Sequence, residues 1–262
     1  MNVSFEKWKN WDAAKCSVEQ NDLIIGISAG PRILSLTHNS GKNILYEDNT
    51  NFSVGEWKMY GGHRFTIAPE NEDSYFPDNY PCEVKLADTA LHVFAKQRPN
   101  GLVLSLSISE SPKGGFYIDH TLFNNGSVNW QGALWAITCV PRSQLLRGAC
   151  KTNEFVFWPG TDASKWKQSD GRLTVEDGDF RGKAGWYSTA PELSAASREG
   201  KLIITSPDTT VPELCVDNGS NVEIFVCAGW AELETLSGKY IVAPDSSVVH
   251  RQHWQFITRK NH

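Results

Sequence analysis

Short strand-like runs separated by turn residues recur along almost the whole chain, about ten residues apart. Turn chemistry is strong at 28–31, where Gly precedes Pro, and at Asn124-Asn125-Gly126. This spacing predicts an all-β protein, an antiparallel sandwich or barrel. One short helix is expected over 189–199, and a loop or hairpin excursion over 160–180. The strand-like runs are 22–27, 32–36, 44–46, 82–86, 90–97, 102–108, 115–123, 129–140, 154–158, 201–206, 221–228, 230–236 and 247–258.

Length and charge narrow the functional classes. The 262 residues contain no linker-like stretch, so we expect one domain over 1–262. A net charge of -5 without a basic stripe argues against nucleic acid or an anionic membrane as partner. No apolar run approaches the roughly 18 residues of a membrane helix. The polar segment 1–11 does not resemble a signal peptide, so a cytoplasmic location is expected.

Motifs for metals and common cofactors are not found. The six cysteines form no Cys-x-x-Cys pair, and the seven histidines form no His-Glu-x-x-His motif. Neither a Walker loop nor a Gly-x-Ser-x-Gly elbow occurs. We therefore expect neither a catalytic metal nor a cofactor.

The segment 230–235 is the strongest candidate for a binding surface. Alternation along a strand puts Trp230, Glu232 and Glu234 on one face, with the carboxylates about 6.5–7 Å apart. Two carboxylates beside an indole suit a saccharide, which stacks on the ring and hydrogen bonds to the acids. A solvated strand face that carries two glutamates is the alternative.

Two other segments combine cations with glycine. In the segment 60–65, two glycines permit close backbone approach before His63 and Arg64. Arg64 offers a planar fork of donors, and His63 exchanges protons near neutral pH. In the segment 180–187, Lys183 and Trp186 suggest the rim of a polar pocket. The alternatives are a structural ion pair of Arg64, an edge position for His63 and a simple surface turn at 180–187.

Taken together, these segments resemble the galactose mutarotase-like superfamily, and more narrowly a bacterial branch of it. The resemblance rests on 24–46, 61–64, 68–70, 77–79, 124–126, 135–138, 183–186, 232–236, 244 and 253–254. It implies a large antiparallel β-sandwich, called a supersandwich, with a sugar cleft on a concave sheet. In aldose epimerases of this superfamily a glutamate is the general base and a histidine the general acid. Glu234 matches the glutamate.

The histidine has two possible matches. One register aligns His120 with the epimerase histidine, whereas a second aligns the 124–126 turn and brings the acid position near Trp135. We prefer the second register because turns fix strand pairing. The usual acid is then missing, or His63 supplies it.

The sequence is therefore compatible with three functions, all with a mono- or oligosaccharide as ligand. The first is an aldose 1-epimerase-like isomerase with Glu234 as base and His63 or His120 as acid. The second is a non-catalytic carbohydrate-binding protein, with Trp135, Trp186 and Trp230 as platforms and Arg64 and Lys183 as anchors. The third is a lyase or hydrolase using Glu232 and Glu234, ranked last because acids on one strand rarely straddle a glycosidic bond. The cations favour an anionic sugar, and the sequence does not predict the oligomeric state.

Overall fold

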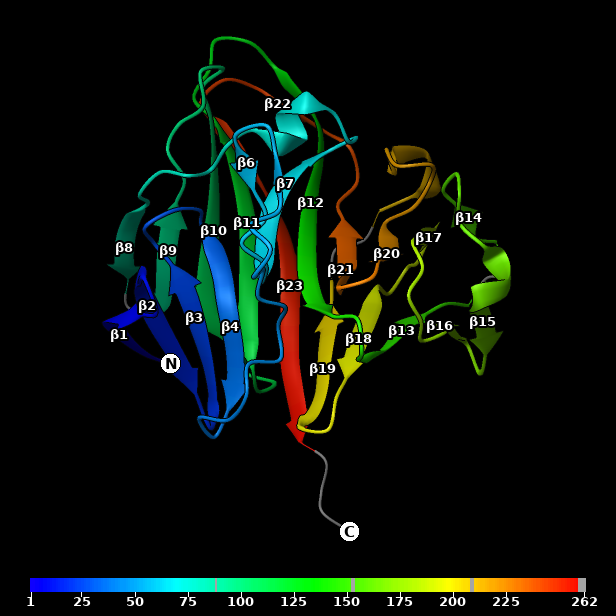
Figure 1. Ribbon diagram of the computed structural model, residues 1–262. Coiled ribbons are helices and arrows are strands. Elements are labelled where there is room, and N and C mark those ends of the chain that lie inside the picture. The colour runs from blue at the N-terminus through cyan, green and yellow to red at the C-terminus, as the bar shows by residue number, and fades with distance from the viewer. Residues whose placement is uncertain (88, 152–153, 208–209, 259–262) are drawn as a thin grey trace.

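Two large antiparallel sheets form stacked layers in the computed structural model of the chain (Figure 1). The structure describes residues 1–87, 89–151, 154–207 and 210–258. The first sheet has 11 strands, in the order β1 (Asn2–Trp8), β2 (Trp11–Val18), β3 (Asn21–Gly26), β4 (Arg32–His38), β7 (His63–Ala68), β12 (Trp130–Pro141), β21 (Trp230–Leu236), β20 (Val222–Val226), β17 (Gly182–Trp186) and β14 (Val156–Phe157), with β22 (Tyr240–Val242) paired to β12.

The second sheet has 10 strands and covers one face of the first. Its order is β15 (Trp166–Ser169), β16 (Arg172–Val175), β13 (Leu145–Ala149), β18 (Glu192–Ala196), β19 (Gly200–Thr205), β23 (Ser246–Thr258), β11 (Phe116–Asn124), β10 (Leu102–Glu110), β9 (Ala90–Phe94) and β8 (Glu83–Ala87). The remaining elements are a hairpin of β5 (Ser53–Val54) and β6 (Trp57–Lys58), and the 3₁₀ turns η1 (Glu72–Tyr75), η2 (Ala163–Lys165) and η3 (Pro212–Leu214).

The hydrophobic core lies between the two sheets. Leu233 of β21 and Ile224 of β20 are fully buried there, together with Ile118 of β11 and Leu202 of β19. Alternation along each strand sends one set of side chains into this layer and the other set outward. The predicted all-β antiparallel sandwich is confirmed.

The helix expected over 189–199 is wrong. The segment forms β18, which pairs with β13 on one side and β19 on the other. Leu193 and Ala195 are buried in the core cluster, so sheet pairing and burial override the weak helical signal of this segment. The predicted strand over 44–46 is also absent, although Ile44 and Leu45 are buried. The excursion over 160–180 is confirmed, since it holds η2 and the β15–β16 hairpin.

Candidate functional site

A cleft of about 480 Å³ lies on the outer face of the first sheet, away from the core. Outward side chains of β7, β12, β17, β20 and β21 form its floor, and the β5–β6 hairpin with nearby loops forms its walls. The lining residues are Phe52, Val54, Trp57, Met59, Arg64, Glu70, Tyr75, Trp135, Trp158, Pro159, Gly160, Thr161, Arg181, Gly182, Lys183, Phe225, Cys227, Trp230, Glu232 and Glu234. Its size and its mixture of aromatic and charged groups are typical of small-molecule sites.

Strand register brings the polar residues of the floor together from distant parts of the sequence. Neighbouring strands align their residues in rows that run across the sheet. One row consists of Arg64, Ile137, Glu234, Glu223 and Gly185. The adjacent row consists of Cys139, Glu232, Phe225 and Lys183.

Gly62 sets the position of β7 at one end of these rows. It has a φ of 66°, a conformation that glycine adopts without steric cost. A Cβ atom at this position would lie 2.1 Å from the carbonyl oxygen of Ile33 on β4. The close backbone approach expected of the glycine pair is therefore confirmed, and Arg64 follows two residues later on the cleft face.

Glu234 is fully buried at the bottom of the cleft, and its two carboxylate oxygens have different surroundings. Its Oε2 accepts a 2.7 Å hydrogen bond from Trp135 Nε1 and a 2.9 Å hydrogen bond from Lys183 Nζ. Its Oε1 has no hydrogen-bond partner among the described residues. A buried acceptor without a partner is costly, so this oxygen is suited to a ligand hydroxyl.

Lys183 lies between two buried carboxyl groups. Its Nζ is 2.6 Å from Glu223 Oε2, in addition to its bond to Glu234, and it lies 4.8 Å from the Trp135 ring centre. Burial alone would lower the pKa of Lys183, but the charges of Glu234 and Glu223 outweigh burial and raise it. Burial also raises the pKa of Glu223 well above its ordinary value. Lys183 thus remains an ammonium ion that compensates the buried acids.

Glu232 is half-buried and open to the cleft. Its Oε1 accepts a 3.2 Å hydrogen bond from Trp230 Nε1. Burial and repulsion by Glu234 raise the pKa of Glu232 to about 7, although Arg64 and Lys183 act in the opposite direction. This carboxyl group therefore exchanges its proton near neutral pH.

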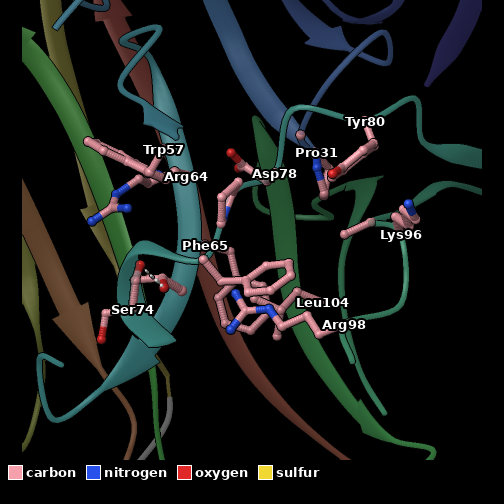
Figure 2. Close-up of a pocket in the computed structure, with 15 residues that line it drawn as sticks. Pro31, Trp57, Arg64, Phe65, Ser74, Asp78, Tyr80, Lys96, Arg98 and Leu104 are labelled. Atoms are coloured by element: carbon pink, nitrogen blue, oxygen red, sulfur yellow. Dashed lines mark hydrogen bonds between the residues drawn. The ribbon is translucent and has the colours of Figure 1, made fainter. Parts of the chain in front are cut away.

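Arg64 is a buried cation held by aromatic rings. Its guanidinium carbon lies 4.5 Å from the Trp57 ring centre and 5.5 Å from that of Tyr75. Figure 2 shows Arg64 against Trp57, on the opposite side of β7 from Phe65. No carboxylate of the described residues lies within 4.0 Å of it, and burial lowers the pKa of Arg64. The alternative of a structural ion pair is therefore not what the structure shows.

A second cavity close to β7 is too small for a sugar. It has a volume of about 20 Å³ and is lined by residues that include Phe65, Arg98 and Leu104 (Figure 2). Such a volume accommodates about one water molecule. Arg98 donates to the carbonyl oxygen of Asp73 and stacks on Phe76, so it holds η1 in place.

Six of the residues predicted for a site line this cleft. They are Arg64, Trp135, Lys183, Trp230, Glu232 and Glu234. Trp186 does not, and its expected position at the pocket is wrong. It shares the inward face of β17 with Ala184, is 1% exposed and donates from Nε1 to the carbonyl oxygen of Ala149. The alternation rule that placed Glu232 and Glu234 together separates Trp186 from Lys183 in the same way.

His63 and His120 also lie away from the cleft, which corrects the expectation that one of them faces the site. Both are fully buried between the sheets, with 2.7 Å between their Nε2 atoms. His120 Nδ1 must donate to the carbonyl oxygen of His250, so its Nε2 accepts from His63 Nε2. His63 Nδ1 then accepts from the hydroxyl of Thr138. The network is complete when both imidazoles are neutral.

The substitution His63→Asn is expected to lower the free energy of unfolding by an amount that depends on pH. Burial, and next the charge of His120, lower the pKa of His63 well below 6.5, so His63 takes up a proton on unfolding once the pH is below about 6.5. The stability that His63 contributes is complete above this pH and is lost as the pH falls towards the folded-state pKa. The loss is at most about 1.4 kcal/mol per pH unit.

Urea unfolding of the wild type and of His63→Asn between pH 5 and 8 measures this effect. The raised pKa values of Glu223 and Glu232 make both proteins less stable as the pH rises, which is the opposite of the effect of His63. Because this contribution is common to both proteins, the difference between their free energies of unfolding isolates the effect of His63. We expect the cost of His63→Asn to be largest above pH 6.5 and to shrink below it. A cost that stays constant with pH would contradict the neutral network.

Several cleft residues were not singled out from the sequence. Glu223 and Phe225 share the outward face of β20, and the alternation within 221–228 could have revealed them. Trp57, Tyr75, Trp158 and Arg181 come from short elements or loops, where the sequence pattern gives no direction to a side chain.

Comparison with solved structures identifies the fold of this chain. No family model matches the chain, and no curated protein matches it. Among solved structures, a galactose mutarotase-like protein from Lactobacillus casei ATCC 334 superposes with a TM-score of 0.66 at 12% identity, covering 94% of this chain and 100% of its own. The chain has the galactose mutarotase-like fold.

Two further structures with the galactose mutarotase-like fold agree with this assignment. A candidate aldose 1-epimerase from Escherichia coli K12 has a TM-score of 0.62 at 8% identity, with 98% of this chain and 100% of that one covered. A galactose mutarotase related enzyme from Lactobacillus acidophilus has a TM-score of 0.59 at 8% identity, with 95% and 99% covered. Identities this low establish the fold alone. Within the described ranges, no helix is long and apolar enough to cross a membrane.

Proposed function

We propose that the cleft binds a mono- or oligosaccharide and that the protein interconverts sugar anomers, with Glu234 as the general base. The observation that carries this proposal is the half-satisfied carboxylate of Glu234. Trp135 and Lys183 fix one oxygen, and the other has no partner among the described residues. Indole rings of Trp135, Trp158 and Trp230 line the same cleft and offer stacking surfaces for a sugar.

The proposed reaction begins at the anomeric hydroxyl group. Glu234 Oε1 takes its proton while the bond between the anomeric carbon and the ring oxygen breaks, a general acid donates a proton to the ring oxygen, and an open-chain aldehyde results. Rotation about the adjacent carbon–carbon bond and reclosure give the other anomer. Lys183 and Trp135 hold the base in place, and such positioning is a major part of acid/base catalysis.

A carbohydrate-binding protein without catalysis is the second candidate. It is favoured by the position of His63 and His120 between the sheets, because neither imidazole lines the cleft. The same aromatic rings and charged groups then serve binding alone.

Saturation-transfer NMR separates these candidates. With catalytic amounts of protein, exchange between the α and β signals should be faster for at least one sugar of a panel of neutral and acidic aldoses. Unchanged exchange for every sugar, together with measurable binding, would favour the second candidate. Neither exchange nor binding across the panel would contradict a saccharide site.

An anionic saccharide is the substrate class that Arg64 favours. This buried guanidinium stacks on Trp57 and has no carboxylate within 4.0 Å among the described residues. A charged hydrogen bond typically contributes about 1.5–3 kcal/mol, which corresponds to roughly tenfold or more in affinity. We expect a uronate to bind at least about tenfold more tightly than the matching neutral aldose, and Arg64→Gln to abolish this preference. Calorimetric titration of both sugars into both proteins tests this, and equal affinities for the wild type would contradict it.

A further inference from the structure

The two carboxyl groups of β21 are anchored in matching ways. In each, one oxygen accepts a hydrogen bond from an indole N–H: Trp135 Nε1 to Glu234 at 2.7 Å, and Trp230 Nε1 to Glu232 at 3.2 Å. We infer that Glu232 is the general acid of the reaction proposed above, a role for which no histidine of the described residues lines the cleft. This inference rests on the proposed function, because it assigns the second proton of the same reaction.

The geometry of Glu232 suits an acid that meets the substrate. It lies two residues before Glu234 on the same strand face, and both side chains line the cleft. Its Oε1 is held by Trp230, and the Sγ of Cys139 is 3.9 Å away. Among the described residues no hydrogen bond reaches Oε2. That oxygen can therefore carry a proton into the cleft, about one strand repeat of 6.5–7 Å from the base.

The environments of the two acids differ in the direction that acid/base catalysis requires. Glu234 forms an ion pair with Lys183. Glu232 has no cation within 4.0 Å in the described part of the chain, and burial with the repulsion of Glu234 raises its pKa to about 7. Pairs of carboxyl groups in unlike surroundings commonly divide the roles of acid and base. The other titratable groups around Glu232 are Arg64 of β7, Cys139 of β12, Lys183 of β17, Tyr75 of η1 and Cys227 after β20.

Over one turnover, each glutamate recovers the protonation state in which it began. As the bond between the anomeric carbon and the ring oxygen breaks, the Glu232 O–H proton passes to the ring oxygen and the anomeric hydroxyl proton passes to Glu234. Glu232 is then a carboxylate and Glu234 a carboxylic acid. Reclosure on the other face of the aldehyde returns both protons. The pair holds one proton throughout, so the charge facing Lys183 and Arg64 does not change.

The test is the pH profile of anomer exchange for the wild type, Glu232→Gln, Glu232→Asp and a control. An acid that must be protonated loses activity as the pH rises through its pKa, so kcat/KM of the wild type should fall above about pH 7. Glu232→Gln should lower kcat/KM by about 10²-fold or more and abolish this alkaline limb. Glu232→Asp should still show the fall in kcat/KM at alkaline pH, but its kcat/KM should be lower than that of the wild type. Glu83→Gln, on the exposed strand β8, should match the wild type.

Binding measurements and circular dichroism show whether Glu232→Gln is folded and holds the sugar. A folded Glu232→Gln variant with the wild-type rate and pH profile would overturn the inference. If that variant does not fold, the wild type alone decides, because a kcat/KM that stays flat from pH 6 to 8 would also overturn it. Failure of the proposed function gives a different result: the wild type then accelerates anomer exchange of no sugar at any pH.

Discussion

Glu234→Gln should slow anomer exchange by about 10²–10⁴-fold while the sugar still binds. The amide has nearly the shape of the carboxylate and can still accept from Trp135 Nε1, but it cannot take a proton from the anomeric hydroxyl. The loss should therefore appear in kcat rather than in affinity. Saturation-transfer NMR gives the rate, and calorimetric titration gives the affinity.

The matched control for Glu234→Gln is Glu83→Gln, the same chemical change on the exposed strand β8. It should leave both the rate and the affinity within experimental error of the wild type. A folded Glu234→Gln protein that retains the wild-type exchange rate would remove Glu234 as the base.

Lys183→Met should lower the free energy of unfolding by about 3–5 kcal/mol, the usual cost of removing one partner from a buried ion pair. The substitution keeps the hydrocarbon stem but leaves Glu223 and Glu234 buried without their counter-charge. The cost should be smaller at low pH, because burial raises the pKa of Glu223 and a protonated Glu223 needs no counter-ion. Guanidinium unfolding at pH 5 and pH 8 measures both effects.

Two further variants make the Lys183 test specific. Lys85→Met removes an exposed lysine paired with Glu83 on β8 and should cost no more than about 1 kcal/mol. Adding Glu223→Gln to Lys183→Met should recover part of the lost stability, since one uncompensated acid is removed. Equal costs for Lys183→Met and Lys85→Met would contradict the proposed compensation of charge.

Strand alternation explains what could be predicted of the site. The sequence 230–236 has a clear period of two, so Trp230, Glu232 and Glu234 were placed on one face, and all three line the cleft. The same alternation puts Lys183 and Trp186 on opposite faces of β17, so only Lys183 lines the cleft although the two are close in sequence. His63 and Arg64 are adjacent on β7 and face opposite ways, so only Arg64 lines the cleft.

The other parts of the cleft depend on contacts between segments far apart in sequence. Trp57 comes from the β5–β6 hairpin and Trp158 follows β14, and neither segment has a periodicity that fixes its direction. The ion pairs of Lys183 require the register of β17, β20 and β21, which strand patterns do not specify. The helix expected over 189–199 failed for a related reason, because pairing with β13 and β19 decides its conformation.

The proposed function requires that Glu234 Oε1, which has no hydrogen-bond partner among the described residues, receives a sugar hydroxyl. A crystal structure of the protein with a bound aldose tests it most directly. We predict a sugar stacked on the cleft indoles, with its anomeric oxygen about 2.6–3.2 Å from Glu234 Oε1. A sugar bound elsewhere on the protein, or bound in the cleft with no hydroxyl near Glu234, would contradict the claim.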